Sequence, residues 1–353
     1  MKKKVISLLL CVCMISSLAA CGGNAENETT ETATETETAT ETETSAETET
    51  GTEESTEAES TSEADTEESK TIALVPPGTI SPYYQAVISG AQEIADQYGY
   101  ELLVNAPNSE SDYASQVQIV EDYITQGVDG IAICAINTEA IVTAVKAANE
   151  ANIPVIMFNG DGQLEGAEAV SYVSYDQYEA GAMVADWAAE NLGTELQVAV
   201  VEGLPSSQST DRMGGFVDKA ASDYPGIQVV ASQSGDWERE TGMNAAANML
   251  QANPDIDLIY ALCDESALGA VQAVKEAGSD AAVIGFDGNP NAVYSILNDG
   301  LVATLSANGE GTGQMVIETF HSYFAGEEVE SIVRVEAVMV DKTNADQFPA
   351  EAD

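Results

Sequence analysis

Short apolar runs alternate with longer amphipathic segments from residue 71 to the end of the chain. The run TIALV at 71–75 is apolar almost throughout, as expected for a strand that is covered on both faces. Ser81 can cap the helix that follows, and Gly99 can end it. The apolar residues between them recur at helical spacing: Val87, Ile88, Ala91, Ile94 and Ala95.

The same alternation continues, with connections of a few residues. Further strands are predicted at 100–106, 130–136, 153–158, 169–175, 197–202, 227–233, 257–263, 281–286, 301–307 and 331–340. Further helices are predicted at 113–127, 138–151, from 176, after 209, and at 239–252, 265–277 and 311–325. Repeated β-α units predict parallel sheets with right-handed crossovers.

The β-α pattern restarts near residue 175, which indicates two doubly wound lobes instead of one sheet. About 283 residues follow position 70, and this length fits two domains. The second set of units ends before the chain does. We therefore expect the last hundred residues to cross back, which would give several hinge strands instead of a single linker.

The chain begins with three lysines and an apolar stretch, Val5 to Leu18, that is too short to span a membrane. This pattern predicts a secretory signal peptide over residues 1–20. The sequence Leu-Ala-Ala-Cys-Gly at 18–22 resembles the bacterial lipobox, which implies that Cys21 is lipidated. The alternative is an ordinary signal peptide that contains a cysteine.

Residues 21–70 are rich in Thr, Glu, Ala and Ser and carry almost no large apolar side chains. Such a segment buries too little apolar surface to offset the entropy of ordering it, so a disordered tether is predicted. Its root-mean-square reach is roughly 40 Å, and repulsion between glutamates extends it further. The sequence leaves glycosylation of the threonines open.

The formal net charge is −49, and the imbalance is not confined to the tether. Beyond position 70, only seven Lys and Arg stand against 43 acidic residues. Nucleic-acid binding is excluded, since phosphates require basic patches. Two cysteines, Cys134 and Cys263, lie in or beside apolar runs, and we expect buried single thiols instead of a disulfide.

Aromatic and small polar side chains follow the predicted strands, at the edge where open parallel sheets bind ligands. A sugar needs flat apolar walls together with amide and carboxylate partners. The side chains that follow the predicted strands supply both. The candidate ligand-binding residues are Ser81, Tyr83, Tyr84, Asn159, Asp161, Thr210, Trp237, Cys263, Asp264, Asp287 and Asn308.

Several candidates also have a purely structural interpretation. One of the two tyrosines, Tyr83 and Tyr84, can merely pack on the sheet. Trp237 can act as a wedge between domains, Asp287 as a turn residue, and Asp264 as the cap of the helix that follows.

Signatures of catalysis are missing from the sequence. It has no GxxxxGK[ST] phosphate loop and no GxSxG elbow. His321, the single histidine, lies in a late helix away from the predicted strand ends, which disfavours a Ser-His-Asp unit or a histidine metal site. A carboxylate pair such as Asp161 and Asp287 would be the alternative for acid–base work. We expect no enzyme, metal or cofactor.

Six segments together resemble the type I periplasmic solute-binding proteins of sugar ABC importers, in their ribose- and galactose-binding branch. The resemblance runs through nearly all of 71–340 in the same motif order. Its most specific part is DESALGA followed by VIGFDG. The segments are TIALV with SPYYQAVISGAQEIADQYGYELLV, VDGIAICAIN, ANIPVIMFN, DRMGGF, ALCDESALGAVQAVKEAG and VIGFDGNPNAVYSILNDGLVATL.

The resemblance implies two Rossmann-like lobes joined by three crossover strands, with the ligand between lobes that close by a hinge. The crossovers would fall near Tyr175, Ala307 and Arg334 to Ala337. The implied domains are a signal peptide (1–20), a lipidated tether (21–70), an N-terminal lobe (71–175 with 308–336) and a C-terminal lobe (176–307 with 337–353).

By position, the family's aromatic pair after the first strand matches Tyr83 and Tyr84, and the polar residue before that pair's proline matches Ser81. A later family aromatic matches Trp237, and the aspartate of GFDG matches Asp287.

The chain departs from ribose-type members elsewhere. Their Asp-Arg after the fourth strand is replaced by Asn159-Gly160, with Asp161 next, and a second arginine is replaced by Thr210. Cys263 stands for an asparagine, and the late glutamine is replaced by Ala307, with Asn308 next.

Loss of two arginines puts ribose in doubt and disfavours anionic ligands. A neutral sugar or polyol is expected, and the alternative is a cationic or nucleoside-like solute that suits the aspartates and the aromatic side chains.

The expected function is that of an exported, lipid-anchored, monomeric receptor on the outer face of the cytoplasmic membrane. It would deliver its solute to an ABC permease. The alternatives are a sensory receptor for a signalling kinase and an extracellular enzyme with a carboxylate pair. The related repressor effector domain is excluded by the export signal.

Overall fold

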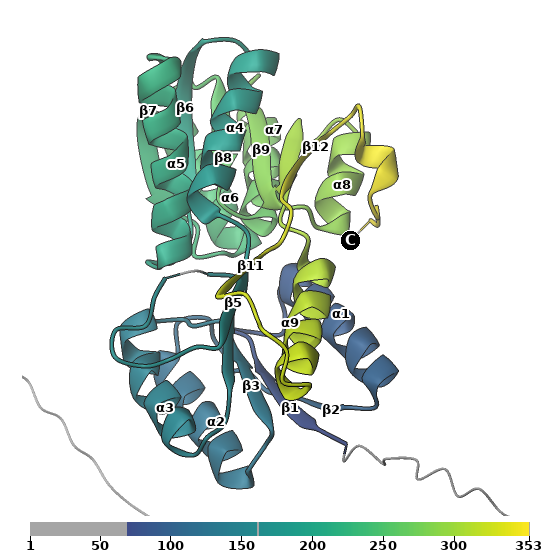
Figure 1. Cartoon of the computed structure of the whole chain (residues 1–353). Helices are drawn as coiled ribbons and strands as arrows, with labels where there is room; N and C mark the ends of the chain where they lie inside the picture. Colours follow the sequence, from purple (N-terminus) through teal and green to yellow (C-terminus); the bar gives the residue numbers. More distant parts are fainter. Residues whose placement is uncertain (1–68, 161, 353) are drawn as a thin grey trace, which may run out of the picture. The chain divides into compact units, whose positions relative to one another are not determined.

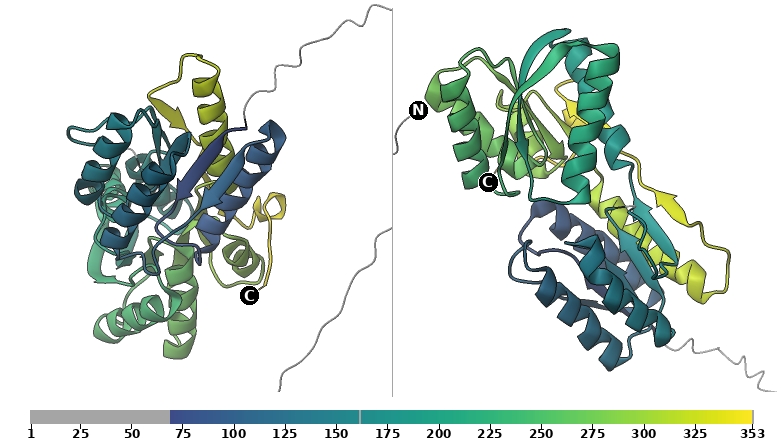
Figure 2. Two further views of the ribbon diagram at one scale, coloured as in Figure 1. Left: turned by 90° about the horizontal axis from the view of Figure 1, so that it is seen from below. Right: turned by 90° about the vertical axis from the view of Figure 1, so that its left-hand side faces the viewer.

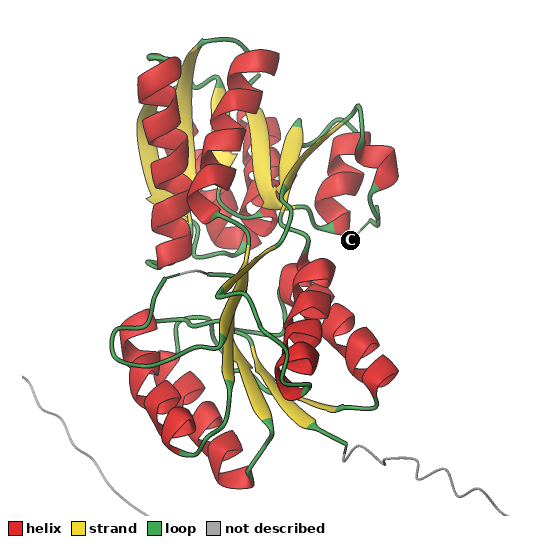
Figure 3. Ribbon diagram, in the orientation of Figure 1, coloured by secondary structure: helices red, strands yellow, loops and turns green. Residues whose placement is uncertain are grey.

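The computed structural model describes residues 69–160 and 162–352, which form two α/β lobes (Figure 1). Each lobe contains one sheet of six strands with helices on both faces, as the secondary-structure colouring shows (Figure 3). The predicted signal peptide, Cys21, nearly all of the tether and Asp161 lie outside the described residues.

The first sheet is parallel throughout, with the strand order β11-β5-β4-β3-β1-β2. Strands β1, β3 and β4 are buried at nearly every residue, which explains why their sequences are continuous apolar runs. The strands are β1 (Thr71–Val75), β2 (Glu101–Val104), β3 (Gly130–Ile133), β4 (Val155–Phe158), β5 (Ser171–Ser174) and β11 (Ile332–Arg334).

Four helices cover this sheet: α1 (Pro82–Tyr98), α2 (Tyr113–Gln126), α3 (Thr138–Glu150) and α9 (Gly309–Phe324). Helix α9 follows the second lobe in sequence but packs on α1 of the first, as Figure 2 also shows. The two helices approach so closely that a Cβ at Gly313 would lie 1.9 Å from the Val87 carbonyl oxygen. Only glycine fits this contact.

The second sheet has the order β12-β10-β9-β8-β6-β7, and only β12 runs antiparallel to its neighbour. Its strands are β6 (Glu195–Glu202), β7 (Gly226–Ser234), β8 (Leu258–Ala261), β9 (Ala282–Asp287), β10 (Ala303–Ser306) and β12 (Val338–Asp341). Its helices are α4 (Gln177–Asn191), α5 (Ser207–Asp223), α6 (Arg239–Ala252), α7 (Asp264–Ala277), α8 (Pro290–Leu297) and the 3₁₀ turn η1 (Ala345–Gln347).

The chain passes between the two sheets three times. It leaves the first sheet after Ser174, returns to that lobe after Ser306, and leaves it again between Arg334 and Val338. The predicted fold class, two doubly wound lobes with three crossovers, is confirmed. The single strand predicted at 331–340 is in fact two strands, β11 and β12, that belong to different sheets.

Polar side chains fix where several helices begin. Asp112, Asn137 and Asp176 each accept a hydrogen bond from a backbone N–H in the first turn of the next helix. Ser206 does the same for α5, so this helix begins at Ser207, earlier than predicted. Helix α8 was not predicted. Among the helices of the described residues, none is both long and apolar enough to cross a membrane.

Candidate functional site

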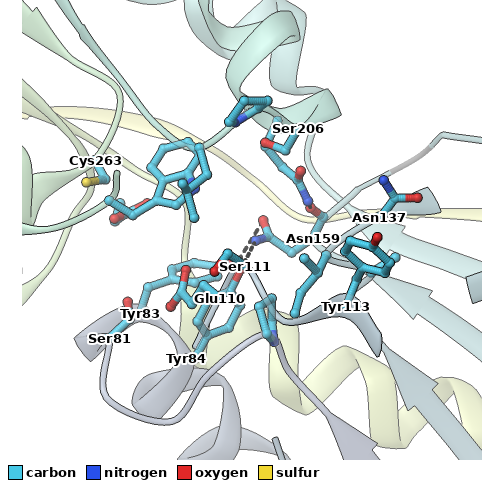
Figure 4. Close-up of a pocket in the computed structure, with 18 of the residues that line it drawn as sticks. Ser81, Tyr83, Tyr84, Glu110, Ser111, Tyr113, Asn137, Asn159, Ser206 and Cys263 are labelled. Atoms are coloured by element: carbon cyan, nitrogen blue, oxygen red, sulfur yellow. Dashed lines mark hydrogen bonds between the residues drawn. The ribbon is translucent and has the colours of Figure 1, made fainter. Parts of the chain in front are cut away.

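A cavity of about 310 Å³ lies between the two lobes, where the carboxyl ends of the parallel strands of both sheets meet. We call it the inner cavity (Figure 4). Its first wall comes from the connections after β1, β2, β3 and β4, and its second from those after β6, β7, β8 and β9. The lining residues are Pro77, Ser81, Tyr83, Tyr84, Glu110, Ser111, Tyr113, Ala135, Ile136, Asn137, Asn159, Leu204, Pro205, Ser206, Gln208, Arg212, Trp237, Cys263, Glu265 and Asp287.

Two tyrosines from the first turn of α1 form part of the first wall. Pro82 is the first residue of this helix, where its missing N–H costs nothing. The rings of Tyr83 and Tyr84 meet edge to face, with centroids 5.3 Å apart. Tyr83 is buried and Tyr84 is half-buried, so Tyr84 offers the more accessible ring.

Asn159 connects both tyrosines to the segment that crosses between the lobes. The Tyr83 hydroxyl donates to Asn159 Oδ1 (3.2 Å), and Asn159 Nδ2 donates to the Tyr84 hydroxyl (3.2 Å). Figure 4 shows this pairing at the centre of the cavity. Gln177 Nε2 donates to the Asn159 carbonyl oxygen at 3.3 Å. Asn159 has a φ of 53°, a conformation that Asn adopts more readily than most residues.

A hydrogen bond beside the cavity joins the two lobes directly. Gln208, in the first turn of α5, donates from Nε2 to the Asn159 carbonyl oxygen (3.2 Å). A Cβ at Gly160 would lie 3.6 Å from the same Gln208 nitrogen. The side chain of Gln208 therefore lies beside Gly160, which stands at the position of the first arginine that this chain lacks.

Trp237 provides the aromatic surface of the second wall. It follows Asp236 in the loop between β7 and α6, and both residues have positive φ, 65° and 54°. The indole packs directly on the backbone of Gly203, where a Cβ would lie 1.9 Å from a ring atom. Gly203 thus makes room for the ring, and no side chain fits between them.

Arg212 forms part of the second wall and is almost fully buried. Its Nε donates to Gln177 Oε1 (2.8 Å) and its Nη2 donates to the Tyr175 hydroxyl (2.6 Å). Its guanidinium also stacks on the Phe286 ring at 3.9 Å from the centroid. These partners hold Arg212 in one orientation, so it acts as a fixed positive charge beside the cavity.

Asp287 ends β9 and lies 3.5 Å from Arg212 Nη1. Burial raises the pKa of Asp287 to about 7, although the nearby Arg212 opposes this rise. Its φ of 124° is unusual for a residue with a side chain. The carboxylate is therefore held in a constrained position at the cavity wall.

Glu110 adds a second carboxylate, from the loop between β2 and α2 of the first lobe. Burial, with a smaller contribution from the carboxylate of Glu238, raises the pKa of Glu110 to about 7. Because Glu238 belongs to the second lobe, two like charges face each other across the gap between the lobes.

The structure brings together seven of the sequence-predicted site residues, all in the lining of the inner cavity: Ser81, Tyr83, Tyr84, Asn159, Trp237, Cys263 and Asp287. Asp161 lies outside the described residues. Three others do not line the cavity. Thr210 is exposed and donates to the Ser206 carbonyl oxygen, and Asn308 caps α9.

Asp264, the third, is directed into its own lobe. It is completely buried and accepts hydrogen bonds from Thr304 Oγ1 (2.6 Å) and the Asn289 N–H (2.7 Å). Burial and the neighbouring Asp287 raise the pKa of Asp264 well above its ordinary value. Its position supports the loop that carries Asp287, and it does not face the inner cavity.

Sequence reasoning did not single out eight polar or aromatic lining residues. Each lies in a segment that follows a strand, but strand-end position alone does not distinguish these residues from the others in the same segments. They are Glu110, Ser111, Tyr113, Asn137, Ser206, Gln208, Arg212 and Glu265.

The two thiols of the folded part are free and buried, as predicted. Burial raises the pKa of both Cys134 and Cys263 to about 12, so they are protonated at neutral pH and poor nucleophiles. His321 lies in α9 and stacks on Tyr98, with centroids 3.8 Å apart. Neither it nor any described group of three His, Cys, Asp or Glu is placed to hold a metal ion in this cavity.

Two doubly wound lobes with an aromatic and polar cavity at their facing strand ends define a solute-binding protein. The family model for the periplasmic binding protein domain matches residues 72–328. The chain belongs to this family.

Two curated relatives are ribose import binding proteins RbsB. The one from Bacillus subtilis is 33% identical over 72% of this chain and 81% of its own length. The one from Escherichia coli is 33% identical over 77% of this chain and 90% of its own length.

Solved structures agree in fold. A periplasmic solute-binding protein of an ABC transporter from Actinobacillus succinogenes, with bound D-allose, has a TM-score of 0.75 at 31% identity. The match covers 79% of this chain and all of that one. A solute-binding protein from Mycobacterium smegmatis with bound glycerol has a TM-score of 0.73 at 29% identity, covering 80% and 100% of the two chains.

Proposed function

We propose that this protein captures a neutral sugar or polyol in the inner cavity and delivers it to an ABC permease. The observation that carries the proposal is the pairing of aromatic rings with fixed carboxylate and amide groups across one cavity. Tyr84 and Trp237 offer flat surfaces to sugar C–H faces, and Asp287 and Asn159 offer hydrogen-bond partners to hydroxyls. Relatives named for ribose and allose support the ligand class.

Binding without chemistry is part of the proposal. Cys263, which lines the cavity, is held as a thiol, and His321 does not line the cavity. The named relatives are import or binding proteins. The protein therefore acts by binding and release, with closure and opening of the lobes as its cycle.

Attachment to the membrane is proposed from the sequence. Lipid at Cys21 would hold the protein on the outer face of the cytoplasmic membrane, and the Thr/Glu-rich segment would act as the tether. The lobes would work as a monomer, with the domain limits 71–175 with 308–336 and 176–307 with 337–353.

A cationic solute is the second candidate, because the cavity walls are acidic. Glu110, Glu265 and Asp287 line the cavity. Within 69–160 and 162–352 the one lining cation is Arg212, which is already engaged with protein groups. An amine on the ligand would be attracted to the carboxylates and to the Trp237 face.

Isothermal titration calorimetry tests the two candidates together. The panel contains D-ribose, D-allose, D-galactose, D-glucose and myo-inositol as neutral ligands, and D-glucosamine as the cationic counterpart of glucose. Binding of a neutral member, lost in Trp237→Ala, supports the proposal. Tighter binding of glucosamine than of glucose and every other neutral member supports the second candidate. Absence of binding to all of them contradicts both.

A further inference from the structure

A second and larger cavity, of about 820 Å³, adjoins the inner one toward the outside of the gap between the lobes. We call it the outer compartment. On the first lobe it is bounded by the two loops 78–82 and 106–111. On the second lobe it is bounded by 236–239, Leu204, Glu265 and Asn291.

The two cavities share part of their lining, so they adjoin each other. The shared residues are Ser81, Glu110, Ser111, Leu204, Trp237 and Glu265. Asp287, Asn159 and Cys263 line only the inner cavity, whereas Thr79, Asn108 and Glu238 line only the outer compartment. Trp237 thus lies at the boundary, where its ring can contact ligand atoms on both sides.

The inner cavity has the volume of a small site. Its 310 Å³ lies at the lower end of the range of roughly 300–1,000 Å³ found for small-molecule pockets. One sugar ring with its hydroxyls suits such a space. A larger solute must extend past Trp237 into the outer compartment.

The walls of the outer compartment include polar side chains that suit hydroxyl groups. Thr79, Asn108 and Ser109 come from the first lobe, and Glu238 and Asn291 from the second. Hydroxyl, amide and carboxylate groups are the partners that sugar hydroxyls use.

Two of the residues that line both cavities, Glu110 and Glu265, carry carboxylate groups. Glu265 is fixed by Arg239, which donates from Nε and Nη2 to its two oxygens at 3.0 Å each. Glu110 makes no hydrogen bond or ion pair within 69–160 and 162–352, so both of its oxygens remain available to a ligand.

We propose that the outer compartment is a second sugar subsite, and that the solute is a disaccharide or a similar two-unit glycoside. One ring occupies the inner cavity against Tyr84 and Asp287. The second unit crosses the boundary at Trp237 and Glu110 and lies between loops 78–82 and 106–111 on one side and 236–239 on the other. This inference rests on the proposed sugar-binding function and names its ligand class.

Calorimetry with matched sugars and two blocking variants tests the inference. The probes are D-glucose with cellobiose and trehalose, D-galactose with lactose and melibiose, and D-allose and D-ribose as further single rings. Thr79→Trp and Asn108→Trp place a bulky ring in the outer compartment from two different loops. Both positions are exposed and line only that compartment, so folding should be retained.

The expected result is a disaccharide that binds at least about tenfold more tightly than either of its monosaccharides. Both blocking variants should remove this gain and leave monosaccharide affinity within about twofold of wild type. Ser206→Trp, which fills only the inner cavity, should abolish binding of all sugars.

Two results would overturn the inference while leaving sugar binding intact. One is a monosaccharide that binds as tightly as every disaccharide, and the other is a disaccharide gain that survives in both blocking variants. If no sugar of either kind binds, the proposed function itself fails and this inference fails with it.

Discussion

The Arg212 guanidinium lies 3.5 Å from the Asp287 carboxylate, and their side chains are only 5% and 10% exposed. Arg212 is fixed by hydrogen bonds to Tyr175 and Gln177, so it cannot swing toward a ligand. It holds the Asp287 carboxyl group in place at the cavity wall, where its oxygens can accept hydrogen bonds from sugar hydroxyls. Arg212 is therefore a positioning residue for Asp287.

Asp287→Asn tests this pair. Asparagine keeps the shape and tolerates positive φ, but it removes the charge. We expect sugar affinity to fall by about tenfold to a hundredfold, since hydrogen bonds to charged groups contribute about 1.5–3 kcal/mol.

Asp299→Asn is the matched control. Asp299 also has positive φ, but it is exposed, pairs with Lys342 and does not line the inner cavity. Its variant should bind sugar like the wild type. Undiminished affinity in Asp287→Asn would remove Asp287 from the proposed site.

Gly203→Ala tests the aromatic wall through its support. The added Cβ would lie 1.9 Å from the Trp237 ring, so the indole must move. We expect a changed tryptophan emission spectrum and a loss of sugar affinity of about tenfold or more, with the circular dichroism of the fold retained.

In the control Gly162→Ala, the new Cβ meets no atom within 4 Å, so affinity and emission should stay unchanged. Equal affinities in Gly203→Ala and Gly162→Ala would show that the position of the Trp237 ring does not matter for binding.

The sequence predicted the fold well because strands of both sheets are continuous apolar runs. Such runs are typical of strands that helices cover on both faces. It also predicted that Tyr84, Trp237 and Asp287 lie at strand ends, and the structure places them in one cavity. The strand at 331–340 was harder to predict, since apolarity alone does not show that the chain changes sheets after Arg334.

The site could not be predicted completely, because strand-end position does not fix side-chain direction. Asp264 and Cys263 are neighbours, yet Asp264 is held inward by Thr304 while Cys263 lines the cavity. Arg212 is buried by rings and hydroxyls distant in sequence, and no local pattern indicates such contacts.

Glu110→Gln tests the raised pKa of this residue. A carboxyl whose pKa is about 7 in the folded state and near 4.5 when unfolded binds its proton more tightly in the folded protein. Its contribution to stability is therefore present below about pH 4.5 and is lost as pH rises through 7. The acidic groups whose charges interact with Glu110 are Glu238 and Asp287, and both remain in the variant.

Denaturant unfolding from pH 4.5 to 8 measures the effect. The free energy of unfolding of the wild type should fall relative to that of Glu110→Gln by an amount of order 1 kcal/mol, after allowance for partial exposure. Parallel pH profiles of the two proteins would show that Glu110 has an ordinary pKa.

Cys21→Ser tests the proposed anchor. Without the thiol there is no lipidation site, so we expect the protein to move from the membrane fraction to the medium and to lose labelling by radioactive palmitate. Sugar affinity of the purified variant should match that of the wild type, because the cavity lies within 69–352. Retention on the membrane in Cys21→Ser would contradict anchoring through this residue.

A crystal structure of the protein with its tightest-binding sugar tests the central claim most directly. Our account predicts the sugar between the lobes, stacked against Trp237 and within hydrogen-bond distance of Asp287 and Asn159. A sugar bound at any other place on either lobe, with the inner cavity holding only solvent, would contradict it.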